Sequence, residues 1–262
     1  MADALSEGTL QSGAEGTRTV AFKYRPGGPP GLIFLGGYRS DMEGTKAQAL
    51  DRYGAAKGLG VMRFDYSGHG RSSGEFDRLG ISEWLEDCVA VFEKTEGPQI
   101  IIGSSMGGWL ALLLNRELRA RGTDRVAGLI LIAPAADMTT ELMLPGFSKE
   151  ERAMLEATGK IERPSDYGAP EVITNYLIED GARHLMFGNG TITTGCEVHI
   201  LQGGQDSSVP PAHAQKLVSH LVLDPVSYTL VPDGDHSLSR EQDMVLVFAA
   251  IERIAGGKDP AG

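Results

Sequence analysis

The chain has 262 residues, of which 35 are Asp or Glu and 24 are Lys or Arg, so its formal net charge is −11. A negative surplus of this size disfavours nucleic acid and anionic membrane surfaces as partners. Apolar residues make up 41% of the sequence, enough to bury the core of one large α/β domain. The longest apolar stretch, at 126–132 with glycine allowed, is far shorter than the roughly 18 residues of a transmembrane helix. We therefore expect a soluble protein that does not insert into membranes.

The sequences of the two ends and the number of cysteines indicate in which compartment the protein is expected. Residues 1–16 contain three acids, no Lys or Arg and no apolar block, so they lack the pattern of a signal or transit peptide. We expect a disordered start and a cytoplasmic location. Residues 256–262 read GGKDPAG, which predicts a frayed C-terminus. Cys88 and Cys196 are too few for a disulfide framework, and they fit a reducing compartment.

Short β-branched runs alternate with helix-length amphipathic segments between residues 17 and 255. This alternation is typical of parallel strands joined by crossover helices, so we predict an α/β fold with a mostly parallel central sheet and helices on both faces. The predicted strands are 17–24, 31–35, 61–66, 99–103, 127–133, 197–202 and 227–231. Unbroken apolar runs at 32–35, 100–102 and 129–132 predict central strands covered on both faces. Residues 25–30 are rich in Pro and Gly, and there we expect a hairpin at the sheet edge.

Helical spacing marks several of the segments between those strands. Apolar residues recur at i, i+4, i+7 and i+8 from Trp84 to Phe92, which predicts a helix that buries Cys88. Similar spacing predicts helices around 214–221 and 244–251. One segment breaks the alternation, because residues 135–195 put 61 residues between two strands where a crossover needs far fewer. We predict a small helical lid inserted there, with helical stretches at 149–158 and 170–183.

Residues 103–107 read GSSMG, directly after a predicted strand and directly before an apolar helical run. A strand, a tight turn and a helix form the context of a nucleophile elbow, in which the strained turn lifts a serine hydroxyl out of the sheet. Ser105 occupies the nucleophile position of that motif. The alternative, a glycine-rich turn with a capping serine, is less consistent with the immediate helix.

Residues 70–74 read GRSSG and match the same five-residue pattern around Ser72. No helix follows at once, so we expect Ser72 to lie in a surface loop. The glycines around His69 also imitate a dinucleotide-binding turn, but they lack the strand-to-helix context and the acid about 20 residues further on. We therefore predict no nicotinamide or flavin cofactor.

A serine needs a base to act as a nucleophile at neutral pH. In this fold class the base follows the last strand, and His236 lies in the turn-rich loop after residues 227–231. His69, in its glycine loop near strand ends, is the strongest rival. Asp206 follows the preceding strand and is our candidate to orient the imidazole, whereas Asp233 and Asp235 have a turn-forming explanation.

An acyl-transfer site also needs hydrogen-bond donors for the oxyanion that develops in the transition state. Gly36 and Gly37 close a predicted strand at the place where hydrolases of this type expose a backbone N–H. The predicted donors are the backbone amides of Tyr38 and Met106.

Three segments carry a resemblance to a known family. Residues 34–47 read FLGGYRSDMEGTKA, residues 64–74 read FDYSGHGRSSG and residues 103–109 read GSSMGGW. With Ser105, Asp206 and His236 in that chain order, the sequence resembles the α/β-hydrolase superfamily over nearly its whole length. The three segments are similar to the branch that contains alpha/beta-hydrolase domain-containing protein ten, which includes a mitochondrial acyl-protein thioesterase and acyl-glucuronide esterase together with bacterial relatives. The resemblance implies the α/β-hydrolase fold and hydrolysis of a carboxylic ester or thioester.

The predicted reaction transfers an acyl group to water. Ser105 attacks the acyl carbonyl, His236 takes up the proton and Asp206 orients the ring, and water then hydrolyses the acyl-enzyme. No metal ion or organic cofactor is implied, and the expected partner is a small-molecule acyl ester or thioester. Two alternatives stay open: a serine aminopeptidase or oligopeptidase on the same fold, and a ligand-binding module without catalysis.

The start of the predicted lid is rich in apolar residues. They are Leu142, Met143, Leu144, Phe147, Met154 and Leu155. We predict that some of them, with Leu142, Met143 and Leu144 as candidates, line a substrate pocket above Ser105 that selects acyl chains longer than acetyl. The alternative is that they only dock the lid onto the sheet.

Overall fold

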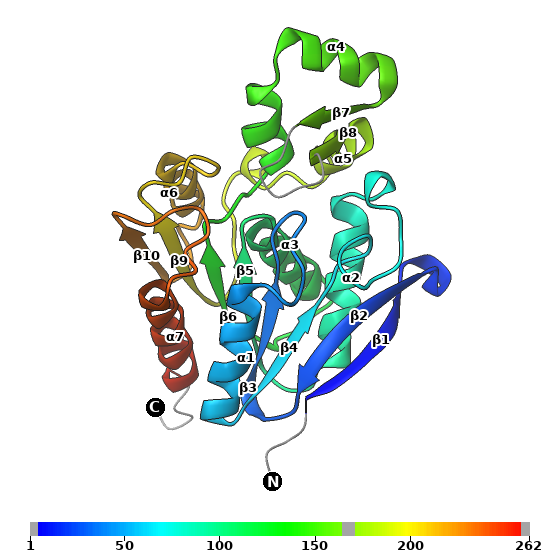
Figure 1. Cartoon of the computed structure of the whole chain (residues 1–262). Helices are drawn as coiled ribbons and strands as arrows, with labels where there is room; N and C mark the ends of the chain where they lie inside the picture. Colours follow the sequence, from blue (N-terminus) through cyan, green and yellow to red (C-terminus); the bar gives the residue numbers. More distant parts are fainter. Residues whose placement is uncertain (1–4, 164–170, 258–262) are drawn as a thin grey trace.

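The computed structural model of the chain describes residues 5–163 and 171–257, and an eight-stranded sheet forms its centre (Figure 1). The strand order is β1-β2-β4-β3-β5-β6-β9-β10. The strands are β1 (Ser6–Ser12), β2 (Arg18–Arg25), β3 (Gly28–Leu35), β4 (Leu59–Phe64), β5 (Gln99–Ser104), β6 (Val126–Ile132), β9 (Glu197–Gly203) and β10 (Val226–Val231). The pairs β1·β2 and β2·β4 are antiparallel, and the remaining pairs of this sheet are parallel. The predicted α/β fold with a mostly parallel sheet is confirmed.

The expected hairpin at residues 25–30 is wrong, because β2 and β3 are not neighbours in the sheet. β4 lies between them: it pairs antiparallel with β2 on one side and parallel with β3 on the other. The Pro- and Gly-rich segment therefore crosses one strand position instead of closing a hairpin. A turn signal marks where the chain reverses, but it does not say which strand will come back to pair there.

The expectation of a disordered start is wrong for residues 6–12, which form the edge strand β1. This strand pairs antiparallel with β2, from Ser6 opposite Tyr24 to Ser12 opposite Arg18. The Ser12 hydroxyl donates a hydrogen bond of 2.5 Å to the buried carboxylate of Asp87, which fixes the end of the strand to helix α2 (Ile81–Lys94). The strand has few apolar residues to mark it, because most of its side chains face solvent.

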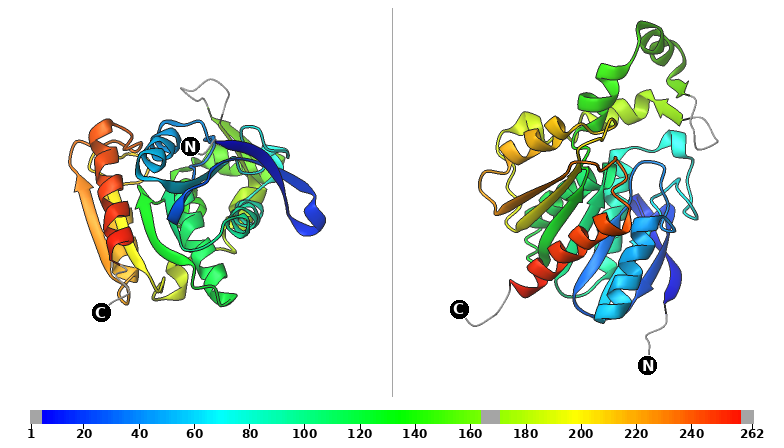
Figure 2. Two further views of the ribbon diagram at one scale, coloured as in Figure 1. Left: turned by 90° about the horizontal axis from the view of Figure 1, so that it is seen from below. Right: turned by 60° about the vertical axis from the view of Figure 1, so that its left-hand side comes forward.

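Five helices cover the two faces of the sheet (Figure 2). They are α1 (Thr45–Lys57), α2, α3 (Met106–Ala120), α6 (Pro211–His220) and α7 (Glu241–Gly256). The predicted helices around 84–92, 214–221 and 244–251 correspond to α2, α6 and α7. On strand β5, Ile101 belongs to the core under α2, α3 and α6, whereas Ile100 and Ile102 belong to the core under α1 and α7. Burial on both faces explains the unbroken apolar runs of the central strands.

Between β6 and β9 the chain forms an insertion that projects above the carboxyl ends of the strands (Figure 1). Its described elements are η3 (Thr139–Met143), η4 (Leu144–Gly146), α4 (Lys149–Thr158), β7 (Lys160–Arg163), β8 (Glu171–Thr174), α5 (Asn175–Gly181) and η5 (Phe187–Asn189). The helix predicted at 149–158 is confirmed with the same bounds. The helix predicted at 170–183 is wrong in its first part, because β8 pairs antiparallel with β7 and the helix starts only after Thr174; Pro170 lies outside the described residues.

Two buried carboxylates hold the base of the insertion: one binds the body of the protein, and the other joins the two ends of the insertion. Asp180, fully buried, accepts hydrogen bonds from the backbone N–H of Ser82 at 2.7 Å and from its hydroxyl at 2.6 Å. These bonds place a negative charge at the N-terminus of α2, where the helix dipole favours it. Asp137, at the start of the insertion, accepts backbone N–H bonds from Met186 and Phe187 at its end. The insertion is therefore pinned at its base, and its distal part has a small core of its own, made of Phe147, Leu155, Ile161, Ile173 and Ile178.

Within the described residues no helix is long and apolar enough to cross a membrane. The last helix, α7, continues to Gly256, so the expected fraying does not begin at that residue. The remainder of the predicted frayed tail, from residue 258, lies outside the described part of the chain.

Candidate active site

Ser105 lies at a sharp turn between strand β5 and helix α3. Its backbone has φ 55° and ψ −118°, an unusual conformation for a residue with a side chain. A Cβ on Gly107 would collide with the carbonyl oxygen of Leu35, and one on Gly103 with that of Gly107. These two glycines therefore let the first turn of α3 pack directly on the strand ends, and the turn presents the Ser105 hydroxyl above the sheet.

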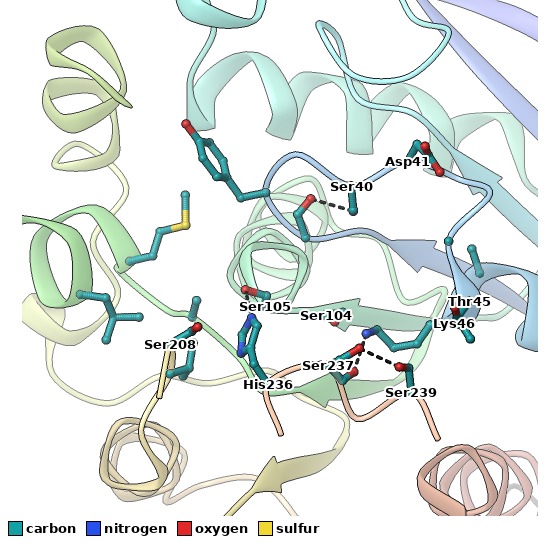
Figure 3. Close-up of a pocket in the computed structure, with 18 of the residues that line it drawn as sticks. Ser40, Asp41, Thr45, Lys46, Ser104, Ser105, Ser208, His236, Ser237 and Ser239 are labelled. Carbon is teal, nitrogen blue, oxygen red and sulfur yellow. Dashed lines mark hydrogen bonds between the residues drawn. The ribbon is translucent and has the colours of Figure 1, made fainter. Parts of the chain in front are cut away.

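His236 reaches Ser105 from the loop between β10 and α7 (Figure 3). Its Nε2 lies 3.0 Å from the Ser105 Oγ, and its Nδ1 lies 2.8 Å from Oδ2 of Asp206. A carboxylate only accepts, so Nδ1 carries the proton and Nε2 is free to accept the proton of the hydroxyl. The predicted trio of Ser105, His236 and Asp206 is thus joined by hydrogen bonds in the order that general-base activation requires.

Asp206 is built into the loop after β9. Its Oδ1 accepts the backbone N–H of Ser208 at 2.9 Å and of Val209 at 2.8 Å, and its Oδ2 also accepts the Gln202 amide at 3.2 Å. Burial raises the pKa of Asp206, but the hydrogen bonds from His236, Val209 and Gln202 outweigh burial and hold that pKa below its ordinary value. The carboxylate therefore stays ionised wherever the protein is folded near neutral pH.

The two neighbouring acids in the same loop as His236 have other partners. Asp235 accepts the backbone N–H of Leu238 at 3.0 Å, and Asp233 forms an ion pair with Arg240 at 2.8 Å. Both stabilise the loop and the start of α7, as their turn-forming explanation predicted.

Ser72 and the remaining histidines are not part of this cluster. The Ser72 hydroxyl donates to the backbone carbonyl of Asp65 at 2.6 Å and accepts the N–H of Ala21 at 2.8 Å, so it joins a loop to β2. His69 uses both ring nitrogens on backbone groups, of Arg39 and Ser67. The other four histidines contact different residues: His184 contacts Ser82, His199 contacts Glu197, His213 contacts Phe187 and His220 contacts Lys216.

The loop after β3 lies beside the serine. A Cβ on Gly37 would sit 3.4 Å from the Cβ of Ser105, so the backbone at this point approaches the nucleophile closely. Tyr38 follows Gly37 in this loop. Met106 is the first residue of α3, and the first N–H groups of a helix have no carbonyl partner within it. The two predicted donor amides therefore belong to residues that adjoin Gly37 and Ser105, and their role as donors stays a prediction.

A cavity of about 620 Å³ lies above Ser105 (Figure 3). Its lining combines apolar residues, several of them from the insertion, with polar residues from the start of α1 and the His236 loop. The apolar lining residues are Phe34, Tyr38, Ala47, Ala135, Met138, Leu142, Met143, Ile173 and Val209. The polar lining includes Ser40, Asp41, Thr45, Lys46, Ser237 and Ser239. Leu142 and Met143 thus line the cavity, as expected.

The prediction that Leu144 lines the pocket is wrong, because Leu144 is not among the residues that line the cavity. It packs with the insertion's own core around Phe147 and Leu155. Leu144 follows Met143 at the change from η3 to η4, and adjacent side chains of a helical backbone point about 100° apart. Met154 does not line the cavity either, and 51% of its surface is exposed. The alternative of docking onto the sheet does not describe Leu144, Phe147 or Leu155, because these residues pack within the insertion itself.

Several lining residues were not singled out from the sequence. Met138 follows the end of β6 by six residues, and Lys46 lies in the first turn of α1. The position after a strand end is the signal that could have found Met138. Lys46 Nζ donates to the backbone carbonyl of Ser237 at 2.5 Å, next to His236. Burial lowers the pKa of Lys46, although Asp235 and Asp243 oppose that change.

Metal ligands are not gathered here. Among residues 5–163 and 171–257, no group of three or more His, Cys, Asp or Glu side chains could hold a metal ion.

The chain is similar to characterised sequences over most of its length. Residues 37–176 match the family described as serine aminopeptidase, S33. The chain is 32% identical over 237 residues to the human protein named palmitoyl-protein thioesterase ABHD10, mitochondrial, which covers 89% of this chain and 75% of the human protein. The corresponding mouse protein is 32% identical over 238 residues, covering 89% of this chain and 77% of its own length.

Two solved structures are close to this fold. A crystal structure from Agrobacterium vitis S4 superposes with a TM-score of 0.91 at 45% identity, and the match covers 96% of this chain and 99% of that one. Mouse alpha/beta hydrolase domain-containing protein 10 superposes with a TM-score of 0.83 at 31% identity, over 95% of this chain and 98% of the mouse chain. The resemblance that the three sequence segments indicated is confirmed. The chain belongs to the α/β-hydrolases of the serine aminopeptidase S33 family, and its relatives there include alpha/beta hydrolase domain-containing protein 10.

Proposed function

We propose that this protein hydrolyses carboxylic esters or thioesters, with Ser105 as the nucleophile, His236 as the base and Asp206 as the group that orients the imidazole. The observation that carries the proposal is the hydrogen-bonded chain from Asp206 through His236 to Ser105, at 2.8 and 3.0 Å, on the floor of a cavity. A hydroxyl that can pass its proton to a neutral imidazole is a competent nucleophile at neutral pH. The intact trio disfavours a binding module without catalysis.

The mechanism has two halves. The Ser105 Oγ attacks the acyl carbonyl as its proton moves to His236 Nε2, and the backbone amides of Tyr38 and Met106 stabilise the oxyanion. Collapse of the tetrahedral intermediate breaks the bond to the alkoxide or thiolate, which takes the proton from His236. Water then attacks the acyl-enzyme with His236 again as the base, and Ser105 is regenerated.

The substrate class follows from the cavity and from the named relatives. The human and mouse relatives are named palmitoyl-protein thioesterases, and the insertion supplies the apolar lining residues Met138, Leu142 and Met143. We propose a fatty acyl ester or thioester, with the acyl chain under the insertion. The same relatives are named mitochondrial; the cytoplasmic location expected from the sequence stays a prediction.

A serine aminopeptidase is the second candidate, because the matching family carries that description. Such an enzyme commonly uses carboxylates to hold the amino group of its substrate. Among the described residues that line the cavity, Asp41 is the one carboxylate, and it accepts the backbone N–H of Glu43. Lys46 and Arg163 add positive charge to the same cavity. This balance favours an acyl ester over a peptide with a free amino terminus.

Replacement of Ser105 tests the proposal directly. We expect Ser105→Ala to lower kcat for nitrophenyl esters and acyl thioesters by at least ~10³-fold, because only binding and the oxyanion donors then accelerate the reaction. Ser72→Ala is the matched control, since it has the same sequence pattern but a structural role. It should leave kcat within about threefold and destabilise the fold by about 1 kcal/mol through its two lost hydrogen bonds. Equal activity losses in the two variants would contradict the assignment.

Asp206→Asn and Asp235→Asn form a second matched pair. We expect Asp206→Asn to lower kcat by about 10³- to 10⁴-fold, because an amide can hold the imidazole in the wrong tautomer, whereas Asp235→Asn should cost less than about tenfold. Steady-state kinetics on one nitrophenyl ester decide between them. A larger loss in Asp235→Asn, with folding intact, would move the orienting role to Asp235.

Asp206→Asn should also change how the stability of the fold depends on pH. The pKa of Asp206 is lowered from 3.8 in the folded protein, so the ionised carboxylate stabilises the fold above that value and the contribution is lost as pH falls through the folded pKa. The difference in melting temperature between wild type and Asp206→Asn should therefore shrink between pH 7 and about pH 3. A difference that stays constant would show that ionised Asp206 is not stabilised by its partners.

The apolar part of the cavity should select the acyl chain. Each buried methylene contributes up to ~0.8 kcal/mol of transition-state binding, or about fourfold in kcat/KM, so octanoyl esters should exceed acetyl esters by at least ~10-fold. Met143→Ala should reduce this preference, whereas Leu144→Ala, which changes a residue outside the cavity, should keep it. A series of nitrophenyl esters from acetyl to dodecanoyl measures both. A maximum at acetyl would show that the insertion does not form an acyl pocket.

A further inference from the structure

The loop of residues 36–40, which carries the candidate oxyanion donor Tyr38, has a backbone that needs outside support. Arg39 has a φ of 60°, in the left-handed region that residues with a Cβ rarely adopt. Within the loop, Ser40 bonds back to the Gly37 carbonyl through its N–H at 3.1 Å and through its hydroxyl at 2.8 Å. These bonds close the turn, but they do not fix its direction relative to Ser105.

His69 contacts this loop from behind. The backbone N–H of Arg39 donates to His69 Nε2 at 3.1 Å, and the His69 Nδ1 lies 3.2 Å from the carbonyl oxygen of Ser67. A backbone N–H can only donate, so Nε2 must be unprotonated and Nδ1 must carry the proton that Ser67 accepts. The ring therefore acts as a neutral spacer between two backbone segments that are 28 residues apart in sequence.

The surroundings keep His69 in this state. The imidazole is 4% exposed, and three aromatic rings pack edge-on against it with centroids 5.0–5.5 Å away: Tyr66, Phe76 and Trp84. Burial lowers the pKa of His69 to about 4; the Ser67 carbonyl opposes this change and the nearby Arg39 adds to it. The acceptor on Nε2 is thus present throughout the pH range in which a histidine base can work.

Two further contacts from the same segment hold the neighbouring backbone. The Tyr66 hydroxyl donates to the Gly36 carbonyl at 3.2 Å. The carboxylate of Asp65 accepts the N–H of Met42 at 2.7 Å and that of Arg71 at 2.8 Å, so it joins the two loops. Asp65, Tyr66 and His69 all follow β4. Their side chains therefore bind the backbone on both sides of Tyr38, at Gly36, Arg39 and Met42.

We propose that His69 is a positioning residue of the oxyanion site: its Nε2 holds the Arg39 N–H and thereby fixes the direction of the adjacent Tyr38 amide toward the reacting carbonyl. The inference rests on the proposed function, since it assigns the support for one of the two proposed donors. An oxyanion donor works only when it is already aimed at the position where the charge develops, and loss of one donor typically costs 10²- to 10³-fold in kcat. A donor that is present but free to turn should lose part of that effect.

Two substitutions of His69 distinguish the effect of its hydrogen-bond acceptor from the effect of its aromatic ring. His69→Phe keeps an aromatic ring in the aromatic cluster but removes the acceptor, and we expect kcat to fall by about 10- to 100-fold with KM changed by less than about threefold. His69→Gln can return a hydrogen-bond acceptor to the position of Nε2. Its kcat should therefore be at least tenfold higher than that of His69→Phe, or close to wild type where the His69→Phe loss is itself less than about tenfold. Affinity for a trifluoromethyl ketone, which forms an oxyanion with the serine, should fall in parallel with kcat/KM.

Ser72→Ala, which removes a hydroxyl bonded to Ala21 and Asp65 in the same loop, is the control and should keep wild-type kcat and inhibitor affinity. The proposal is overturned if His69→Phe keeps kcat within threefold of wild type, or if His69→Phe and His69→Gln lose the same activity, since packing alone would then explain the loss. If His69→Phe does not fold, Tyr66→Phe decides: a fall in kcat of about threefold to tenfold at unchanged KM supports positioning of the Tyr38 loop by the residues after β4, and no change rejects it. Activity that survives Ser105→Ala would instead reject the proposed function itself.

Discussion

The close packing of helix α3 on the ends of the central strands is the constraint on which the rest of this structure depends. Only glycine fits at positions 103 and 107, because a side chain at either would meet backbone carbonyl oxygens. This contact forces the left-handed turn at Ser105 and brings the first N–H groups of α3 to the carboxyl edge of the sheet. Parallel strands end at that edge, so the loops after β3, β9 and β10 converge on the serine.

Buried carboxyl groups hold two of these loops and several other segments in place. Each of them accepts at least one backbone N–H from a loop or a helix start: they are Asp65, Asp87, Asp137, Asp180 and Asp206. Backbone donors cannot move away as side chains can, so these bonds fix the loops to which the donors belong. Asp65 and Asp206 act in this way at the loops after β3 and β9, next to the active site.

The parts of the structure that depend on local sequence patterns could be predicted. The strand, turn and helix around Ser105 lie within about twenty consecutive residues, so their pattern is complete in the sequence. Asp206 and His236 follow the same logic, since each comes directly after a parallel strand. The helix predicted at 149–158 coincides with α4, and the structure shows that its start is set locally, by the capping serine Ser148 and an acidic first turn.

What could not be predicted depends on partners that are distant in the chain. The strand β1 is recognisable only once β2 lies beside it, and β4 separates β2 from β3 although it follows both in sequence. Strand β8 is four residues long and looks like the start of a helix until β7 pairs with it. The lining of the cavity also depends on distant segments: Lys46 and Met138 come from separate parts of the chain, and Leu144 packs into the core of the insertion instead.

The most direct test of the account is to map the residue that a fluorophosphonate probe modifies. Intact-mass spectrometry of the full chain, followed by peptide mapping, should show one adduct per chain, on Ser105, with loss of esterase activity in proportion to labelling. The adduct should be absent in Ser105→Ala and unaffected in Ser72→Ala. Labelling at Ser72 or at another residue, or full activity in protein whose Ser105 is modified, would contradict the central claim that Ser105 forms the acyl-enzyme.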